Sequence, residues 1–209
     1  MPEPKILLAT HNQHKVAEIR EILAAALPGF SPTMLISAAD LEIPEPVEDA
    51  TSFAGNALIK AGEAARAAGI PALADDSGIR VDILGGAPGI FSARWSGKHG
   101  ADRENLELLL AQLADVPEGS RGANFTCTAA LALPDGRWKT CSGQIYGSLG
   151  FAPAGANGFG YDPIFVPQGE QRTLAEMTPE EKNRISHRRA AFQRIAPWVG
   201  KALGLTSNS

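Results

Sequence analysis

The sequence predicts a single α/β domain, residues 1–209, built around a mixed β-sheet. Short apolar runs of strand length are interspersed with amphipathic segments at helical spacing, so strands and helices are mixed along the chain. The turn Leu-Pro-Asp-Gly-Arg at 133–137 lies between two extended segments, which indicates an antiparallel hairpin. No linker, repeat or low-complexity tract divides the chain, and its 44% hydrophobic and 20% charged residues are ordinary for a globular protein.

The first strand and helix are predicted within the first thirty residues. The run KILLAT, residues 5–10, is short and apolar, as expected of a buried strand. A helix beginning at about Gln13 should follow, because four apolar residues recur at helical spacing. These residues are Val16, Ile19, Leu23 and Leu27.

A second helix and strand are predicted before the midpoint of the chain. Ser52 is a favourable N-cap for the segment FAGNALIKAGEAARAAG, and Gly69 with Pro71 should end that helix. The apolar run 72–74 predicts a buried strand, which we expect to end at Asp75.

The second half of the chain predicts two further helices around the hairpin. A glycine-rich loop at 85–97 precedes a helix that Asp102 opens, and residues 147–160 are expected to be irregular. The Thr-Pro pair at 178–179 suits an N-cap and first helical position, and Pro197 should kink the last helix. The helix from Asp102 has an apolar face formed by Leu106, Leu109, Leu110 and Leu113.

Charge, apolar runs and cysteines exclude several classes of protein. The net charge of −4 argues against binding a nucleic acid polymer, which needs a basic surface. With no run of membrane-spanning length and no signal peptide, we expect no membrane partner and a cytoplasmic location. The hairpin places Cys127 opposite Gly143, so a disulfide to Cys141 is not expected, and no Cys-x-x-Cys pair indicates a zinc or redox site.

The segment THNQHK, residues 10–15, lies at the junction of the first strand and helix. Unpaired N–H groups and the positive end of the helix dipole suit phosphate binding there. Thr10 and Asn12 add hydrogen-bond donors, and Lys15 adds a positive charge. The alternative is a helix cap with a solvated lysine, since the glycines of a Walker loop are missing.

Two adjacent carboxylates, Asp75 and Asp76, follow a buried apolar run. Neighbouring strand residues point to opposite faces, so the two cannot both face one site while the strand stays regular. One could be braced by donors while the other holds Mg²⁺ or activates water. Ser77 and Gly78 would let the backbone turn past a ligand, and the alternative is a surface Asx turn.

The segment GFGYDPIF offers aromatic faces near the end of the irregular stretch. A planar base could stack on Phe159 or Tyr161, while Pro163 holds Asp162 extended. The alternative is an aromatic strand that packs in the core.

The segment EKNRISHRRAA concentrates cations near a helix start. The helix dipole disfavours cations there unless they serve an anion or an acceptor-rich ligand. The alternative is a solvated basic face. The cationic residues are Lys182, His187, Arg188 and Arg189.

Five segments in this order resemble the inosine triphosphate pyrophosphatase family. They are THNQHK, FAGNALIKA, ADDSGIRVDILGGAPGIFSARWSG, GFGYDPIF and EKNRISHR, and from the first to the last they span nearly the whole chain. The resemblance implies a long mixed sheet with flanking helices that form two lobes around a central active-site cleft. It also implies a homodimer that uses Mg²⁺ to hydrolyse dITP, ITP and XTP to the monophosphate and pyrophosphate, which cleanses the nucleotide pool.

The resemblance also implies roles for individual residues. Asp76 would be the general base and a metal ligand, and Asp75 would support it. His187 and Arg188 would donate to the 6-oxo group that adenine lacks. The substrate-binding set would be Thr10, His11, Asn12, Gln13, His14, Lys15, Ser77, Phe159, Gly160, Tyr161, Asp162, Lys182, His187 and Arg188.

Two departures from the family pattern affect the predicted site. His11 stands where the family commonly has Gly or Ser, so it reshapes the expected phosphate loop. The stretch PVEDATSF has Val47 at the first acidic position of the family pattern. We therefore nominate Glu48 as the second metal ligand, with Glu45 as the alternative.

Two other functions remain open at this point. One is a septum-inhibitor-like pyrophosphatase of related fold that prefers modified pyrimidine nucleotides. The other is a nucleotide-binding regulatory protein without turnover. The motifs SHR and FGYDP favour the inosine type, and the intact Asp76, Lys15 and Lys182 argue for an enzyme.

Overall fold

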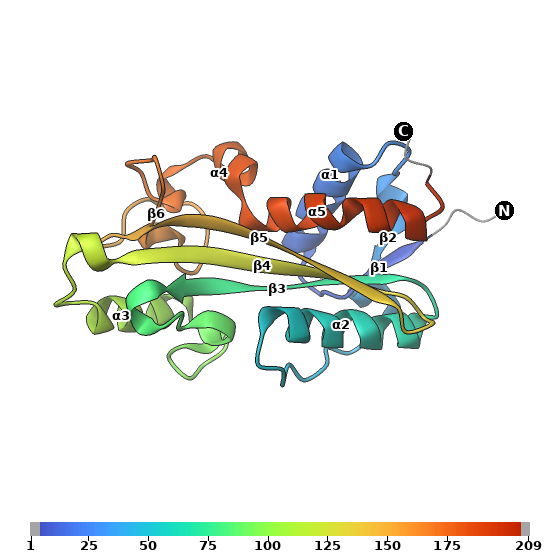
Figure 1. The fold of residues 1–209 in the computed structure, drawn as a ribbon, viewed down its shortest axis with the longest axis horizontal. Helices are drawn as coiled ribbons and strands as arrows, with labels where there is room; N and C mark the ends of the chain where they lie inside the picture. Colours follow the sequence, from blue (N-terminus) through green and yellow to red (C-terminus); the bar gives the residue numbers. More distant parts are fainter. Residues whose placement is uncertain (1–4, 206–209) are drawn as a thin grey trace. The chain divides into compact units, whose positions relative to one another are not determined.

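A computed structural model of the chain describes residues 5–205 (Figure 1). The strands of this part form a sheet in the order β2-β1-β3-β4-β5-β6. β1 (Ile6–Leu8) pairs in parallel with β2 (Leu35–Ser37) and with β3 (Ala72–Val81), whereas β5 (Trp138–Leu149) pairs antiparallel with β6 (Phe165–Pro167). The predicted α/β class with a mixed sheet is confirmed, while the two lobes and the cleft stay a prediction.

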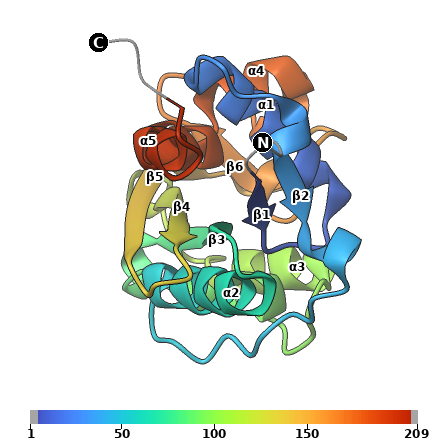
Figure 2. The same cartoon turned by 90° about the vertical axis from the view of Figure 1, so that its right-hand side faces the viewer.

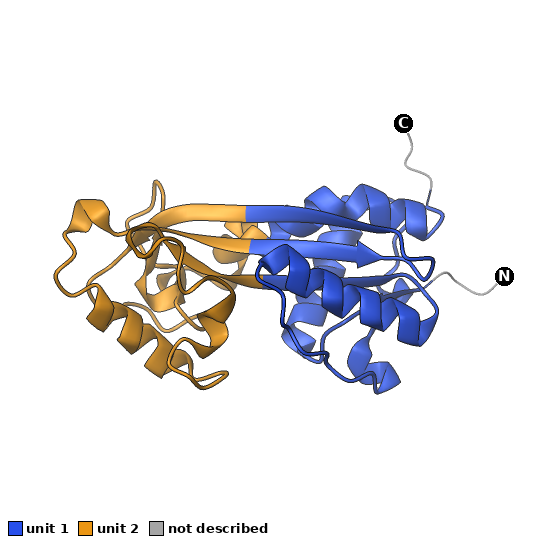
Figure 3. Cartoon of the chain, turned by 60° about the horizontal axis from the view of Figure 1, so that its bottom comes forward, with its two compact units in different colours: residues 1–76, 127–143, 188–209 blue, residues 77–126, 144–187 orange. Residues whose placement is uncertain are grey.

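The chain divides into two compact units, coloured in Figure 3. Neither is a continuous stretch of sequence, because β3, β4 (Gly122–Ala132) and β5 each pass from one unit to the other. The single domain expected over 1–209 stays a prediction. Unit 1 consists of residues 1–76, 127–143 and 188–209, and unit 2 of residues 77–126 and 144–187.

Unit 1 has helices on both faces of its strands (Figure 2). α1 (Gln13–Ala26) and α5 (His187–Ala202) cover one face, where Leu8 is fully buried in their core. α2 (Phe53–Ala68) covers the other face and packs its alanines against Leu7. Leu7 and Leu8 bury opposite faces because side chains alternate along a strand.

Unit 2 has its own apolar core. α3 (Asp102–Gln112) contributes Leu109, which is fully buried, and the ring of Phe125 lies 4.8 Å from that of Phe165 between centroids. α4 (Pro179–Ile185) precedes α5 along the chain. Short 3₁₀ helices complete the elements of the described chain: Pro32–Met34, Ala38–Leu41, Asp82–Leu84, Gly89–Arg94, Glu118–Ser120, Asp162–Ile164 and Leu174–Glu176.

The predicted helix ends are confirmed by their caps. The Ser52 hydroxyl accepts from the backbone of α2, and Gly69 ends that helix in the left-handed conformation, with φ of 67°. Thr178 caps α4 through a capping box with Glu181. α5 runs from His187 to Ala202 with Pro197 inside it. No helix among the described residues is long and apolar enough to cross a membrane.

The hairpin is also confirmed, with the predicted register. The backbone N–H of Leu133 donates to the carbonyl of Arg137 at 2.8 Å, which closes the turn. Cys127 and Cys141 are both free thiols.

The predicted end of the third strand at Asp75 is wrong. β3 continues through the acidic pair to Val81. The hydroxyl of Ser92 accepts from the backbone of Ile79 at 2.9 Å, so a segment distant in sequence supports the extended backbone. A Cβ at Gly78 would lie 2.4 Å from the Ser92 hydroxyl. Glycine therefore admits this neighbouring segment and does not make the expected turn.

Candidate active site

The turn into α1 is fixed by its own side chains. The Oδ1 atom of Asn12 accepts from the backbone N–H groups of His14 at 2.9 Å and of Lys15 at 3.3 Å. The buried Thr10 hydroxyl accepts from the N–H of Asn12 at 3.2 Å. This leaves the amide N–H₂ of Asn12 as a donor beside the positive end of the helix dipole. The side chains of His11, Gln13 and His14 are exposed.

Lys15 points from α1 to the end of the buried apolar run in β3. Its ammonium donates to both carboxylate oxygens of Asp75, at 3.1 and 3.2 Å. The lysine side chain is partly exposed, at 27%, and Asp75 is nearly inaccessible, at 2%. A phosphate that reached Lys15 would therefore share the ammonium with a buried carboxylate.

Asp75 belongs to a buried charge network in unit 1. Arg188 of α5 donates through Nε to Asp75 at 3.3 Å and through Nη1 to Glu18 at 2.8 Å. Burial alone would raise the pKa of Asp75, but the charges of Lys15 and Arg188 outweigh it and hold the pKa well below its usual range. Asp75 therefore stays ionised inside the fold and fits the supporting role predicted for it.

Asp76 lies on the opposite face of β3, against α2, as strand alternation predicts. Asn56 Nδ2 donates to its Oδ2 atom at 3.1 Å, and Lys60 Nζ lies 3.6 Å from its Oδ1 atom. Asn56 is fully buried, and its Oδ1 atom accepts from the N–H of Ala50 at 3.0 Å. The amide of Asn56 is thus held in the orientation that donates to Asp76.

The environment of Asp76 raises the pKa of its carboxyl group. Burial is the main cause, and the negative charges of Glu48 and Asp75 add to it, while Lys60 and the bond from Asn56 oppose it. A carboxylate with a raised pKa is a better proton acceptor near neutral pH. The raised pKa fits the general-base role predicted for Asp76, and that role stays a prediction.

Lys60 is a site residue that the sequence analysis missed. Its ammonium lies 2.9 Å from Glu48 and 3.6 Å from Asp76, so it bridges the two carboxylates. Burial alone would lower the pKa of Lys60, but the charges of Asp76, Asp75 and Glu48 outweigh it and raise the pKa. Asn56 and Lys60 are four residues apart on α2 and so share one face, a polar pair in an otherwise alanine-rich segment. This polar pair is the feature of the sequence from which a role for Lys60 in the site could have been predicted.

The carboxylates of unit 1 fit a magnesium ion. Glu48 and Asp76 both lie beside the partly buried ammonium of Lys60, so the two carboxylates are close enough to act on one cation. Glu45, the alternative ligand, lies 3.1 Å from His11 and is 68% exposed. Residues 5–205 contain no cluster of three candidate ligands. Mg²⁺ is commonly held by one or two carboxylates together with water and substrate phosphates, so two suffice.

Unit 2 brings together a second group of predicted residues. The Oδ2 atom of Asp162, a buried residue, accepts from the backbone N–H of Phe159 at 2.8 Å and from the ammonium of Lys182. The ring of Phe159 is exposed and lies 4.8 Å from that ammonium. Asp162 therefore fixes a loop that exposes the ring of Phe159, with the partly exposed Lys182 beside it.

Other predicted residues of unit 2 are held by the fold. The buried Tyr161 hydroxyl donates to the Ser92 carbonyl at 2.9 Å, and burial raises the pKa of this phenol. The backbone of Gly160 donates to Asp102 at 3.0 Å. The ring of His187 stacks on Phe125, with centroids 5.2 Å apart. Ser77, the first residue of unit 2 in β3, is partly exposed.

The predicted set therefore separates into groups within each unit. In unit 1, Lys15 and Arg188 both form ion pairs with Asp75. The Lys60 ammonium forms ion pairs with both Glu48 and Asp76. Arg188 was expected among base-reading donors, and its Nε and Nη1 atoms are bonded to carboxylates. Its role in reading the base stays a prediction.

Comparisons with known proteins agree over nearly the whole chain. The model of the Ham1 family matches residues 6–198. A Streptomyces avermitilis protein named dITP/XTP pyrophosphatase is 56% identical over 200 residues, which cover 96% of this chain and 99% of the relative. The solved HAM1 protein from Coxiella burnetii is 38% identical, with a TM-score of 0.86 over 95% of this chain and 99% of its own. A Mycobacterium abscessus structure named nucleoside-triphosphatase and dITP/XTP pyrophosphatase is 46% identical, with a TM-score of 0.76 over 93% of this chain and 98% of its own.

Proposed function

The chain belongs to the Ham1 family, and we propose that it hydrolyses the non-standard purine nucleotides dITP, ITP and XTP to the monophosphate and pyrophosphate. The resemblance drawn from the five sequence segments is thereby confirmed at the level of the family. Relatives named dITP/XTP pyrophosphatase support a purine pyrophosphohydrolase. They give no support to a pyrimidine-directed enzyme or to a binding protein without turnover.

The observation that supports this chemistry most is the environment of Asp76. Its carboxylate is partly buried, its pKa is raised, and Asn56 orients it through Oδ2. Asp76 accepts the proton of the attacking water through Oδ1, the oxygen that faces Lys60. Lys60 keeps the deprotonated form accessible because its positive charge lowers the pKa that burial raises.

The cofactor in this proposal is Mg²⁺, held by Asp76 and Glu48. When bound, the ion would neutralise charge on the triphosphate. The two carboxylates supply the hard oxygen ligands that Mg²⁺ prefers.

The phosphates bind at the start of α1. The backbone N–H groups of Asn12, His14 and Lys15 already donate to the side chains of Thr10 and Asn12. The donors left for a phosphate near the positive helix end are therefore the Thr10 hydroxyl, the Asn12 amide N–H₂ and the Lys15 ammonium. Lys15 stabilises charge that develops on the pyrophosphate leaving group. Because Asp75 also binds Lys15, the carboxylate fixes where the ammonium lies.

The base contacts residues of unit 2. The exposed ring of Phe159 offers a stacking face, and Asp162 with Lys182 holds its loop. His187 is proposed to donate to the 6-oxo group. Arg188, which was predicted to join it, belongs to unit 1, and its bonds to Asp75 and Glu18 support a role in the fold. A homodimer in the cytoplasm, without a nucleic acid polymer or membrane as partner, completes the proposal.

A pyrophosphate-release assay over a panel of nucleotides tests the proposed function. The panel consists of dITP, XTP, dATP, dGTP and a 5-methylated pyrimidine triphosphate. We expect kcat/KM for dITP and XTP to exceed that for dATP by about tenfold or more, because an adenine amino group leaves buried donors unpaired. Preferential turnover of the pyrimidine, or release of orthophosphate, would contradict the proposal.

A further inference from the structure

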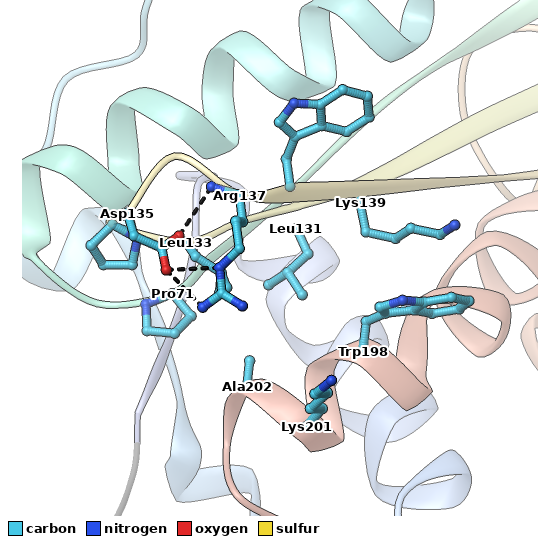
Figure 4. A pocket seen from close by; sticks show the side chains of 11 residues that line it. Pro71, Leu131, Leu133, Asp135, Arg137, Lys139, Trp198, Lys201 and Ala202 are labelled. Carbon is cyan, nitrogen blue, oxygen red and sulfur yellow. Dashed lines mark hydrogen bonds and ion pairs between the residues drawn. The ribbon is translucent and has the colours of Figure 1, made fainter.

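Unit 1 contains a cavity of about 490 Å³ that none of the residues assigned to catalysis or substrate binding lines. It lies between the hairpin that joins β4 to β5 and the C-terminal part of α5 (Figure 4). Its volume falls within the range of about 300–1,000 Å³ that is usual for small-molecule sites. The cavity is therefore large enough for a ligand of its own.

One part of the cavity is apolar and aromatic. Leu131 and Leu133 of the hairpin and Ala202 of α5 line it, together with the indole of Trp198. Trp198 is 41% exposed, which is a large exposed surface for a tryptophan in a helix that packs on the core. An indole with one polar N–H and a wide apolar face is well suited to contact a planar ring.

The other part of the cavity is cationic. Arg137 and Lys139 are two residues apart along the hairpin and so share one face, and Lys201 reaches the cavity from α5. The Lys139 ammonium lies 4.4 Å from the centroid of the Trp198 ring. Asp135 is the one carboxylate of the described residues lining the cavity, and it is already paired with Arg137 at 2.6 Å. Lys139 and Lys201 therefore give the cavity a net positive charge in a chain whose net charge is −4.

We propose that this cavity is a second ligand site, which binds a planar aromatic ring that carries a phosphate group, as in a nucleoside monophosphate. The ring stacks on Trp198, and the phosphate binds Lys139 and Lys201. Stacking accepts any base because every base has a π-face, so the site does not select among purines as the active site does.

The charge of the cavity disfavours a second copy of the chain as its occupant. A two-fold dimer contact brings the same surface of both copies together. Lys139 and Lys201 of both copies would then be gathered in one contact, and bringing like charges together is destabilising. An anion complements this surface, whereas another copy of it does not.

Isothermal titration with AMP tests the site, because adenine is the base that the proposed active site rejects. We expect wild-type protein to bind AMP, and the Lys139→Ala/Lys201→Ala variant to bind it about tenfold or more weakly. Trp198→Leu should weaken AMP binding by a similar factor and leave binding of inorganic phosphate unchanged. The matched control, Arg66→Ala/Arg103→Ala, removes two exposed cations elsewhere and should bind AMP as wild type does.

The rate of dITP hydrolysis separates this proposal from the active site. All of these variants should hydrolyse dITP at the wild-type rate, because none of the residues belongs to the proposed catalytic set. AMP binding that is unaffected in the lysine variant would overturn the proposal, as would no binding at millimolar AMP. Inorganic phosphate that binds as tightly as AMP would also overturn it, since the ring would then contribute nothing. A change of oligomeric state in the lysine variant, without AMP binding to wild type, would assign the face to a contact between copies.

Discussion

Replacing Arg188 by methionine separates two roles for this residue. If Arg188 reads the base, the variant should lose selectivity between dITP and dATP. If it serves the fold, as its bonds to Glu18 and Asp75 indicate, the variant should lose stability and leave selectivity intact. We predict the second outcome, because the base would have to compete with two carboxylates for the guanidinium.

The expected loss of stability follows from the geometry of the network. Removing one partner of a buried ion pair costs about 3–5 kcal/mol. The lower end applies here, because Asp75 keeps Lys15 at 3.1 Å and Glu18 is 21% exposed to water. A loss of about 3 kcal/mol corresponds to a fall of about 6–12 °C in melting temperature for a chain of this length. Since domains are stable by about 5–15 kcal/mol, the variant should still fold.

Two measurements on the same preparation decide between the roles. Urea unfolding followed by circular dichroism gives the stability, and steady-state kinetics with dITP, XTP and dATP gives the selectivity. We expect kcat/KM to fall by a similar factor for all three nucleotides, and the exposed control Arg184→Met to match wild type in both measurements. If the stability were unchanged and the ratio of kcat/KM for dITP to kcat/KM for dATP became smaller, the structural role would be refuted.

Three further predictions concern the carboxylates. Because the pKa of Asp75 is lowered in the folded state, its carboxylate stabilises the fold above the unfolded pKa of about 4, and this stability is lost as pH falls toward the lower folded pKa. In urea titrations at pH 7 to 3, the free energy of unfolding of Asp75→Asn should therefore fall less with decreasing pH than that of wild type, and an equal fall would disprove the coupling. Lys60→Gln should raise the pKa of Asp76, measured by ¹³C NMR on metal-free protein, and should lower kcat/KM for dITP by about tenfold or more. An unchanged pKa of Asp76 would contradict the contact between Lys60 and Asp76. Asp162→Asn should release the Phe159 loop and raise KM for dITP about fivefold with a smaller change in kcat, whereas an effect on kcat alone would argue against a binding role.

The helix ends could be predicted because their causes are local. Ser52 and Thr178 cap their own helices within three residues, and Gly69 ends α2 by its own backbone conformation. The hairpin is local too, since its turn fixes the register. These features require no knowledge of which distant segment packs against them.

The remaining features depend on partners far along the chain. β3 continues past Asp75 as a strand, and the hydroxyl of Ser92, thirteen residues beyond Ile79, accepts a hydrogen bond from the backbone N–H of Ile79. Arg188 meets Glu18 across 170 residues, so the basic run around it gave no sign that its donors were occupied. Lys60 lies on a recognised motif, but its role depends on which carboxylates the fold places beside α2.

The identification of Asp76 as the general base is tested most directly by pyrophosphate release from dITP by the Asp76→Asn variant. Asparagine is nearly the same size, and its carbonyl oxygen can still accept from Asn56, so the fold should be retained. We predict that the rate falls by roughly 10²–10⁴-fold while the circular dichroism spectrum and melting temperature stay close to wild type. A folded variant that releases pyrophosphate at nearly the wild-type rate would contradict the assignment.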